Sequence, residues 1–310
     1  MISCTEFIPA YSELFAYIDR NYGRSEVDEF WKYLFVPDGK GIPLVNFVLK
    51  EGIKGCFTYW AASLNEEAAD FTMCLNEKAG WFTIKMHKCP SKGRLLELKN
   101  ELGITPYKDY CLHCDSYRSA VEKIGLKYLY DFQGIDKAAC QILIYDPKIF
   151  DGRVIMDENT VVMDSRASDN EYFHRDFHSS MNMGVHYLGE KYGEAAVIDY
   201  LNTYTENVYN KLIKQIEENG ISAIAEKIKD TYAKEKCEEA LSIQLSEGKL
   251  LVNLHFCPAV KHLKETGREV SPWFVYTTTV VMQRLAKAAS LEFKMISYNE
   301  ETGASTYSFE

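Results

Sequence analysis

The chain has 310 residues, of which 46% are hydrophobic and 26% are charged. This composition is typical of globular proteins, and the length is enough for two domains of about 150 residues each. The formal net charge is −10. Since no long basic run is present, we expect neither nucleic acid nor anionic lipid as a partner. No stretch approaches the roughly 18 uninterrupted apolar residues of a membrane span, so we expect a cytoplasmic protein.

In the first half of the chain, several helical segments precede a mixture of strands and helices. Residues 70–74 and 81–87 alternate as the strands of a hairpin, and residues 126–132 and 138–145 alternate as a second hairpin. Between them, residues 90–101 and 110–124 have helical periodicity. Residues 151–169 are rich in aspartate and contain Gly152, so we expect a linker there.

The second half repeats this order of elements. Periodicity predicts helices over residues 172–188, 194–218 and 221–234, strands over 241–244 and 250–255, helices from 258 and over 277–289, and strands over 292–298 and 305–309. We therefore predict an α+β fold in two tandem copies, residues 1–150 and 170–310, joined by the linker. The element order resembles the ligand-binding layout of vinyl-4-reductase and nitric-oxide-sensor domains.

Short motifs support an internal duplication. Gly52 and Gly220 are 168 residues apart, and so are Cys89 and Cys257. Each of these cysteines lies within a His-x-Cys-Pro motif at the end of a predicted strand. A constant spacing of this kind is the signature of a repeat. Because its histidine is present in both copies, we expect His87 to have a structural role, as a hydrogen bond across its hairpin.

The two copies differ most in their cysteines. Nine cysteines is an odd number without the dense spacing of a secreted scaffold, which favours free thiols in a reducing compartment. Seven of them lie in the first copy: Cys4, Cys56, Cys74, Cys89, Cys111, Cys114 and Cys140. The second copy holds only Cys237 and Cys257. We therefore expect the first copy to carry the function.

The densest group of reactive side chains is Cys111, Cys114 and Asp115. On a helix over residues 110–124 these side chains and Arg118 would share one face. Cys111 would open that helix, and the helix N-terminus together with Arg118 would lower the pKa of its thiol and make it a nucleophile. The plain alternative is that these cysteines pack in a core.

A zinc site is a further alternative for the same thiols. Cys111 and Cys114 have the Cys-x2-Cys spacing, and the site would be completed by Cys89 and His87 or by Cys140. The chain lacks a second pair with matching spacing. We therefore expect no cofactor, with zinc as the alternative.

The order of Cys89, Cys111 with Asp115 four residues later, Gly134 and Cys140 resembles the L-2-amino-thiazoline-4-carboxylic acid hydrolase family. The resemblance covers about residues 85–145. It implies hydrolytic opening of a small cyclic amidine or thioimidate that bears a carboxylate; the activity that names the family yields N-carbamoyl-cysteine. The chain departs from the family pattern in the position of the aspartate, which lies directly beside Cys114.

The resemblance also implies roles for individual residues. Cys111, or Cys114 in its place, would attack the amidine carbon or hold a water-activating network, Asp115 would transfer protons, and Cys140 would belong to the catalytic group. Arg118 or Lys137 would pair with the substrate carboxylate, with Cys89 nearby. The second copy keeps Cys257 but has residues 274–277 in place of the middle cysteines, as a degenerate partner.

The second copy has a histidine pattern of its own. His174 and His178 are four residues apart and would share a helix face, which suits a pocket wall or a divalent metal. The alternative is an amphipathic helix that simply begins with histidines.

Three classes of function therefore remain. The first is a cysteine-dependent hydrolase of a small cyclic substrate, and the second is a non-catalytic module that binds a small molecule or a metal. The third is a duplicated module that serves assembly, with one copy as a scaffold.

Overall fold

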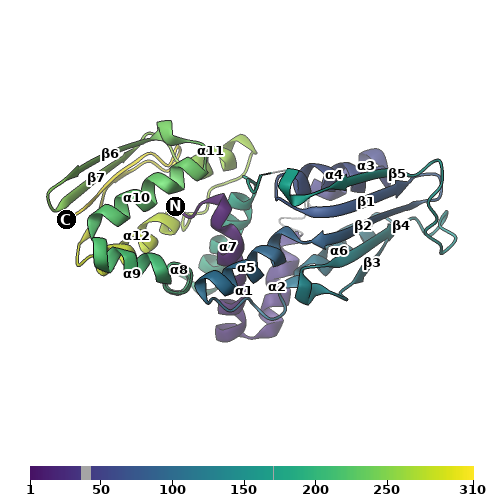
Figure 1. The fold of residues 1–310 in the computed structure, drawn as a ribbon, viewed down its shortest axis with the longest axis horizontal. Coiled ribbons are helices and arrows are strands. Elements are labelled where there is room, and N and C mark those ends of the chain that lie inside the picture. Colours follow the sequence, from purple (N-terminus) through teal and green to yellow (C-terminus); the bar gives the residue numbers. More distant parts are fainter. Residues whose placement is uncertain (36–42, 170) are drawn as a thin grey trace. The chain divides into compact units, whose positions relative to one another are not determined.

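The computed structural model describes residues 1–35, 43–169 and 171–310 (Figure 1). It combines helices with antiparallel sheets, which confirms the predicted α+β class. Within those ranges, no helix has both the length and the apolar character that crossing a membrane requires. The chain divides into two compact units. Unit 1 comprises Met1–Tyr17, Glu101–Thr105 and Arg175–Glu310, and unit 2 comprises Ile18–Asn100 and Pro106–His174.

Unit 2 contains a five-stranded sheet in the order β3-β4-β2-β1-β5. Its strands are β1 (Asp70–Asn76), β2 (Trp81–Lys88), β3 (Lys127–Asp131), β4 (Cys140–Tyr145) and β5 (Val161–Ser165). Its helical segments are α2 (Arg24–Phe35), α3 (Pro43–Glu51), α4 (Lys54–Asn65), α5 (Pro90–Leu102), η3 (Tyr110–Ser116), α6 (Tyr117–Lys123) and η4 (Ile135–Lys137). Helix α1 (Phe7–Tyr22) begins in unit 1 and ends in unit 2, and α5 crosses the same division.

One face of this sheet forms the core of unit 2. Phe71, Met73 and Leu75 alternate along β1 and are 0–2% exposed, and Phe82 and Ile84 of β2 are equally buried beside them. This period of two is the pattern that identified the strands in the sequence. Helix α4 packs on β1 and β2, and α6 packs on β3. The covered face therefore presents its side chains toward the helices of unit 2.

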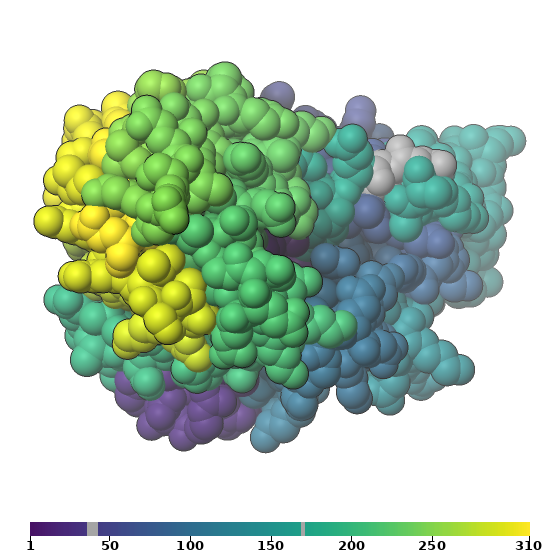
Figure 2. Space-filling model, turned by 60° about the vertical axis from the view of Figure 1, so that its left-hand side comes forward, coloured from purple at the N-terminus to yellow at the C-terminus, as the bar shows by residue number. Residues whose placement is uncertain are grey.

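Unit 1 contains a four-stranded sheet in the order β6-β7-β9-β8. Its strands are β6 (Leu241–Ser246), β7 (Lys249–Leu254), β8 (Phe293–Tyr298) and β9 (Ser305–Phe309). Its helical segments are η1 (Cys4–Glu6), the start of α1, α7 (Phe177–Tyr192), α8 (Glu194–Val208), α9 (Asn210–Asn219), α10 (Ile221–Lys234), η6 (Glu238–Ala240), α11 (Pro258–Glu265) and α12 (Tyr276–Ala288). Helices α10 and α12 pack against the sheet. In the space-filling view the near surface of unit 1 consists largely of its later residues, in green and yellow (Figure 2).

The two sheets have the same connectivity, as the predicted duplication requires. Each sheet contains two hairpins that pair through their second strands. In unit 2, β2 of the hairpin β1-β2 pairs with β4 of the hairpin β3-β4. In unit 1, β7 of the hairpin β6-β7 pairs with β9 of the hairpin β8-β9. The His-x-Cys-Pro motifs lie at equivalent places: Cys89 follows β2 and precedes α5, and Cys257 follows β7 and precedes α11. Cys89 Sγ accepts the Lys92 N–H at 3.4 Å in the first turn of α5, whereas the Cys257 side chain makes no such capping hydrogen bond at the start of α11. The motif therefore marks a helix N-terminus in both copies.

The boundaries of the units differ from the predicted division at residues 150 and 170. Met1–Tyr17 packs with the second copy, because its buried residues belong to the core of unit 1; the Tyr200 hydroxyl, for example, donates to the Ala10 carbonyl oxygen at 2.8 Å. The predicted linker over residues 151–169 is also partly wrong. Val161–Ser165 forms β5 and pairs antiparallel with the edge of β1. Exposed backbone groups at a sheet edge readily accept such a strand.

Candidate functional site

Four of the predicted site cysteines come from three parts of the unit 2 fold. Cys140 is the first residue of β4 and pairs with Met86 of β2, on the covered face of the sheet. Cys89 follows β2, and its N–H donates to the Ala138 carbonyl oxygen at 2.7 Å, which ties it to the loop before β4. Cys111 and Cys114 lie on η3.

These four thiols are near enough to one another for their charges to interact. Burial raises the pKa of Cys114 well above its usual value, and negative charges on Cys89, Cys111 and Cys140 raise it further. Burial also raises the pKa of Cys89 to about 12, with smaller contributions from charges on Cys140 and Cys111. Charges act on one another in this way only over short distances. The Tyr130 hydroxyl, from β3, is hydrogen-bonded to Cys140. The group therefore lies where one end of the sheet meets η3 and the start of α5.

The predicted activation of Cys111 is wrong. Residues 110–116 form a 3-10 helix instead of the start of an α-helix. Burial raises the pKa of the Cys111 thiol to about 11, and the positive charge of Lys92 only partly opposes this. Arg118 is occupied elsewhere: its Nη2 lies 2.7 Å from Asp115 Oδ1, and its Nη1 donates to the Tyr128 carbonyl oxygen. Cys111 is therefore a neutral thiol at pH 7.

Cys114 has a base beside it that the sequence interpretation did not identify. Its Sγ lies 3.6 Å from His113 Nε2. The His113 ring also contacts the Tyr110 carbonyl oxygen through Nδ1. Because a carbonyl can only accept, Nδ1 carries the hydrogen, and Nε2 is the acceptor for the thiol. Burial lowers the pKa of His113 to about 4, so the imidazole is neutral near pH 7. This is a thiol–imidazole pair with a fixed tautomer.

A partly buried carboxyl group lies near the same thiol. A charge on Glu67, which follows α4, raises the pKa of Cys114 and of Tyr117. Burial raises the pKa of Glu67 itself to about 7. No motif marks this residue in the sequence, because its pKa depends on the packing around it. Asp115, the predicted proton carrier, instead forms the ion pair with Arg118.

A lysine ammonium group completes the environment of the thiols. Lys92 lies in the first turn of α5, is 9% exposed, and its charge lowers the pKa of Cys111. Within the described part of the chain, none of the carboxylates forms an ion pair with Lys92. A largely buried cation without a counter-ion is costly, so such a group is usually retained to bind an anion.

The remaining predicted residues lie outside this group. Lys137 is exposed on η4. His87 is exposed and its Nε2 lies 2.8 Å from Thr72 Oγ1 on the neighbouring strand, which confirms its role as a hydrogen bond across the hairpin. The proposed zinc set of Cys89, Cys111, Cys114 and His87 is not assembled. In the described ranges, one group of three such donors has mutual distances within 4.8 Å, and it lies in unit 1.

The two predicted pocket histidines do not share a site. His174 belongs to unit 2, where its Nδ1 lies 2.6 Å from Glu66 Oε2. His178 belongs to unit 1, where its Nε2 lies 3.0 Å from Glu235 Oε2. The predicted continuous helix is responsible for the error, because α7 begins only at Phe177.

Unit 1 has a different chemistry at the place equivalent to the thiol group. In unit 2, Met86 pairs with Cys140, and at the equivalent place in unit 1, Leu254 pairs with Ser305. A serine therefore replaces Cys140 in the second copy. Val260 stands at the position of Lys92 in the helix after the Cys-Pro motif. A small cavity here is lined by apolar, aromatic and hydroxyl side chains, among them Phe274, Val275 and Thr278. The second copy thus keeps one thiol of the group, Cys257 at the position of Cys89, and lacks the counterparts of Cys140 and Lys92.

Comparison with protein-family models, with curated proteins and with solved structures gives no match. The case for a function therefore depends on the chemistry of these side chains.

Proposed function

We propose that unit 2 is a thiol-dependent hydrolase of a small cyclic amidine or thioimidate that bears a carboxylate, such as 2-amino-thiazoline-4-carboxylate. The observation that carries the proposal is the contact between Cys114 Sγ and His113 Nε2 at 3.6 Å. A thiol beside an imidazole of fixed tautomer is the usual arrangement of a cysteine nucleophile and its base.

The substrate class is inferred from Lys92. Lys92 is 9% exposed as a whole residue, its charge lowers the pKa of Cys111, and it has no counter-ion among the described carboxylates. A substrate carboxylate would supply that counter-ion through a charge-assisted hydrogen bond. It would also cancel the charge that lowers the pKa of Cys111. Burial raises the pKa of both Cys111 and Cys114. We assign the nucleophile to Cys114, because His113 Nε2 lies 3.6 Å from its Sγ and can take its proton, and we assign Cys111 to the wall of the site.

The reaction has two steps. In the first, Cys114 Sγ forms a bond to the amidine carbon while its proton passes to His113 Nε2. The ring bond from that carbon to sulfur breaks, and the leaving sulfur takes the proton from His113. In the second, water attacks the same carbon, gives a proton to His113, and expels Cys114, which recovers that proton. The net change is the addition of one water molecule.

Glu67 suits a supporting role in this scheme. A carboxyl group with a pKa of about 7 exchanges protons readily at neutral pH. Since its charge raises the pKa of Cys114, its neutral form favours development of the thiolate.

The test is turnover of 2-amino-thiazoline-4-carboxylate, with N-carbamoyl-cysteine detected by mass spectrometry. Cys114→Ser should lower kcat by about 1,000-fold or more, because the alcohol is a far weaker nucleophile at this pH. Cys74→Ser is the matched control, since Cys74 is a partly buried thiol on β1 outside the group. Equal activity of the two variants would reject cysteine catalysis and favour a non-catalytic binding module.

A further inference from the structure

A second cluster of donor atoms lies in unit 1. Cys4 opens η1, His178 lies in the first turn of α7, and Glu235 directly follows α10. The sulfur of Cys4, a ring nitrogen of His178 and a carboxylate oxygen of Glu235 lie within 4.8 Å of one another. All three residues are buried, with exposures of 1%, 2% and 0%.

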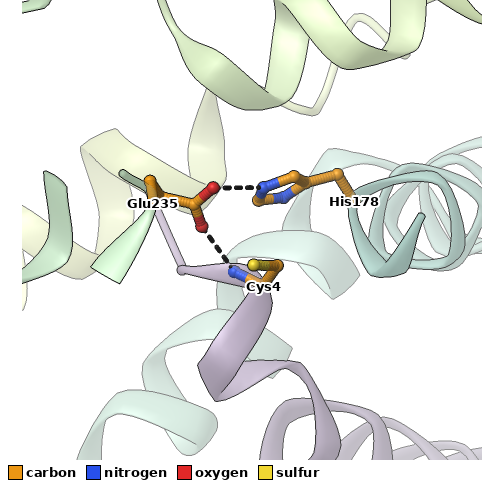
Figure 3. A group of neighbouring side chains, drawn as sticks. All are labelled: Cys4, His178 and Glu235. Carbon is orange, nitrogen blue, oxygen red and sulfur yellow. Dashed lines mark hydrogen bonds and ion pairs between the residues drawn. The ribbon is translucent and has the colours of Figure 1, made fainter. Parts of the chain in front are cut away.

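The Glu235 carboxylate is the centre of the cluster. One of its oxygens lies 3.0 Å from His178 Nε2, and the other accepts the backbone N–H of Cys4 at 2.6 Å (Figure 3). The sulfur of Cys4 lies on the same side of the carboxylate as the imidazole. Both the backbone N–H and the thiol of Cys4 are hydrogen-bonded to the Glu235 carboxylate. The three side chains therefore already face one another.

The charges of the three groups match a divalent cation. The Glu235 carboxylate accepts hydrogen bonds from His178 Nε2 and from the Cys4 N–H, which stabilise its charged form. A bound metal would make the Cys4 thiol a thiolate and would take the imidazole as a neutral ligand. One thiolate, one carboxylate and one neutral imidazole then balance two positive charges.

We propose that Cys4, His178 and Glu235 form a binding site for one thiophilic divalent cation, with zinc as the preferred ion. Zinc takes sulfur, imidazole nitrogen and carboxylate oxygen together, and such a mixed set excludes magnesium and calcium. Around a tetrahedral zinc, these donors lie roughly 3.4–3.6 Å apart, so small side-chain movements are enough. The Ser3 hydroxyl, which is hydrogen-bonded to both Cys4 and Glu235, is the neighbouring oxygen for a fourth position.

The site has a structural role. Exposures of 2% or less leave no room for a substrate to reach the three side chains. The ligands come from the N-terminal segment, from α7 and from the end of α10, which are far apart in the sequence. A cation would fix these three segments to one another, and binding energy at such a site is also folding energy. The inference is independent of the proposed hydrolase, because it concerns other residues in the other unit.

The experiment uses the full chain, first treated with a chelator and then titrated with zinc against a chromogenic competitor. We expect one equivalent of tight zinc in the wild type and at least about 100-fold weaker binding in Cys4→Ser. Cys237→Ser, which changes another buried thiol of unit 1, should bind as the wild type does. Circular dichroism of both variants shows whether the fold is retained.

Cobalt provides a second readout that identifies the ligand. Cobalt bound to the wild type should give a thiolate-to-metal charge-transfer band in the near ultraviolet, and this band should be absent in Cys4→Ser. Glu235→Gln, which keeps the size of the side chain, should also weaken zinc binding. Binding below one equivalent in the wild type, or tight binding that persists in Cys4→Ser, would overturn the proposal. The second result would assign zinc to the thiols of unit 2 instead.

Discussion

Substitution of Lys92 by methionine should separate activity from stability. Lys92 is 9% exposed and has no carboxylate partner in the described part of the chain. If its ammonium binds the substrate carboxylate, Lys92→Met removes one charge-assisted hydrogen bond, which is worth about 1.5–3 kcal/mol. This corresponds to a loss of about 10- to 150-fold in kcat/KM. The loss should appear mainly in KM, because the carboxylate does not take part in the bond changes.

The same substitution should not destabilise the fold. Methionine has a similar length and carries no charge that must be buried, so the free energy of unfolding should stay the same or rise by about 1 kcal/mol. Activity and stability would then change in opposite directions. A purely structural lysine would lose stability without any change in KM.

The assay combines steady-state kinetics with urea unfolding of the same preparations. Lys137→Met is the matched control, since Lys137 is an exposed lysine on η4. It should leave both KM and the free energy of unfolding unchanged. A fall in stability with unchanged KM in Lys92→Met, or an equal rise in KM in both variants, would refute the assignment of Lys92 to the carboxylate.

Two further predictions concern stability. Burial raises the pKa of Glu67 to about 7, so the folded state holds its proton more tightly than the unfolded state, and stability is lost as the pH rises from about 4.5 through 7. Glu67→Gln should remove this loss. At pH 8 the unfolding free energy of the variant should exceed that of the wild type by on the order of 3 kcal/mol, and at pH 4 it should not exceed it. Parallel pH profiles of the two proteins would contradict this prediction. Gly303 and Gly248 both have positive φ, +66° and +73°, but their surroundings differ. A Cβ added at Gly303 would lie 2.4 Å from the Cβ of Cys257, whereas a Cβ added at Gly248 would meet nothing within 4 Å. Gly303→Ala should therefore cost clearly more unfolding free energy than the roughly 1 kcal/mol expected for Gly248→Ala, and equal urea midpoints would contradict the close packing.

The sequence predicted the strands of both sheets well, because alternation depends only on which face is buried. The strand predicted over residues 305–309 has those bounds in the structure. Strand β5 was missed because Val161, Val162 and Met163 lie in an aspartate-rich stretch whose composition favours a linker. The strand forms only because β1 offers an edge, which is a tertiary effect.

The thiol group was predictable in its members but not in its chemistry. The periodicity of residues 110–124 predicted one helix, and that geometry placed Arg118 near Cys111. The actual 3-10 segment places His113 beside Cys114 and leaves Arg118 with Asp115. Glu67 and Lys92 escaped prediction for another reason. Their importance comes from burial and from missing counter-ions, which no local pattern of residues records.

The most direct test of the proposed chemistry is to trap the covalent intermediate. The wild-type protein is mixed with 2-amino-thiazoline-4-carboxylate, quenched in acid within one turnover, digested and analysed by mass spectrometry. The account predicts a substrate-derived adduct on the peptide that contains Cys114, absent from Cys114→Ser and retained in Cys74→Ser. Product formation with the adduct on another cysteine, or with no adduct and undiminished turnover in Cys114→Ser, would contradict it.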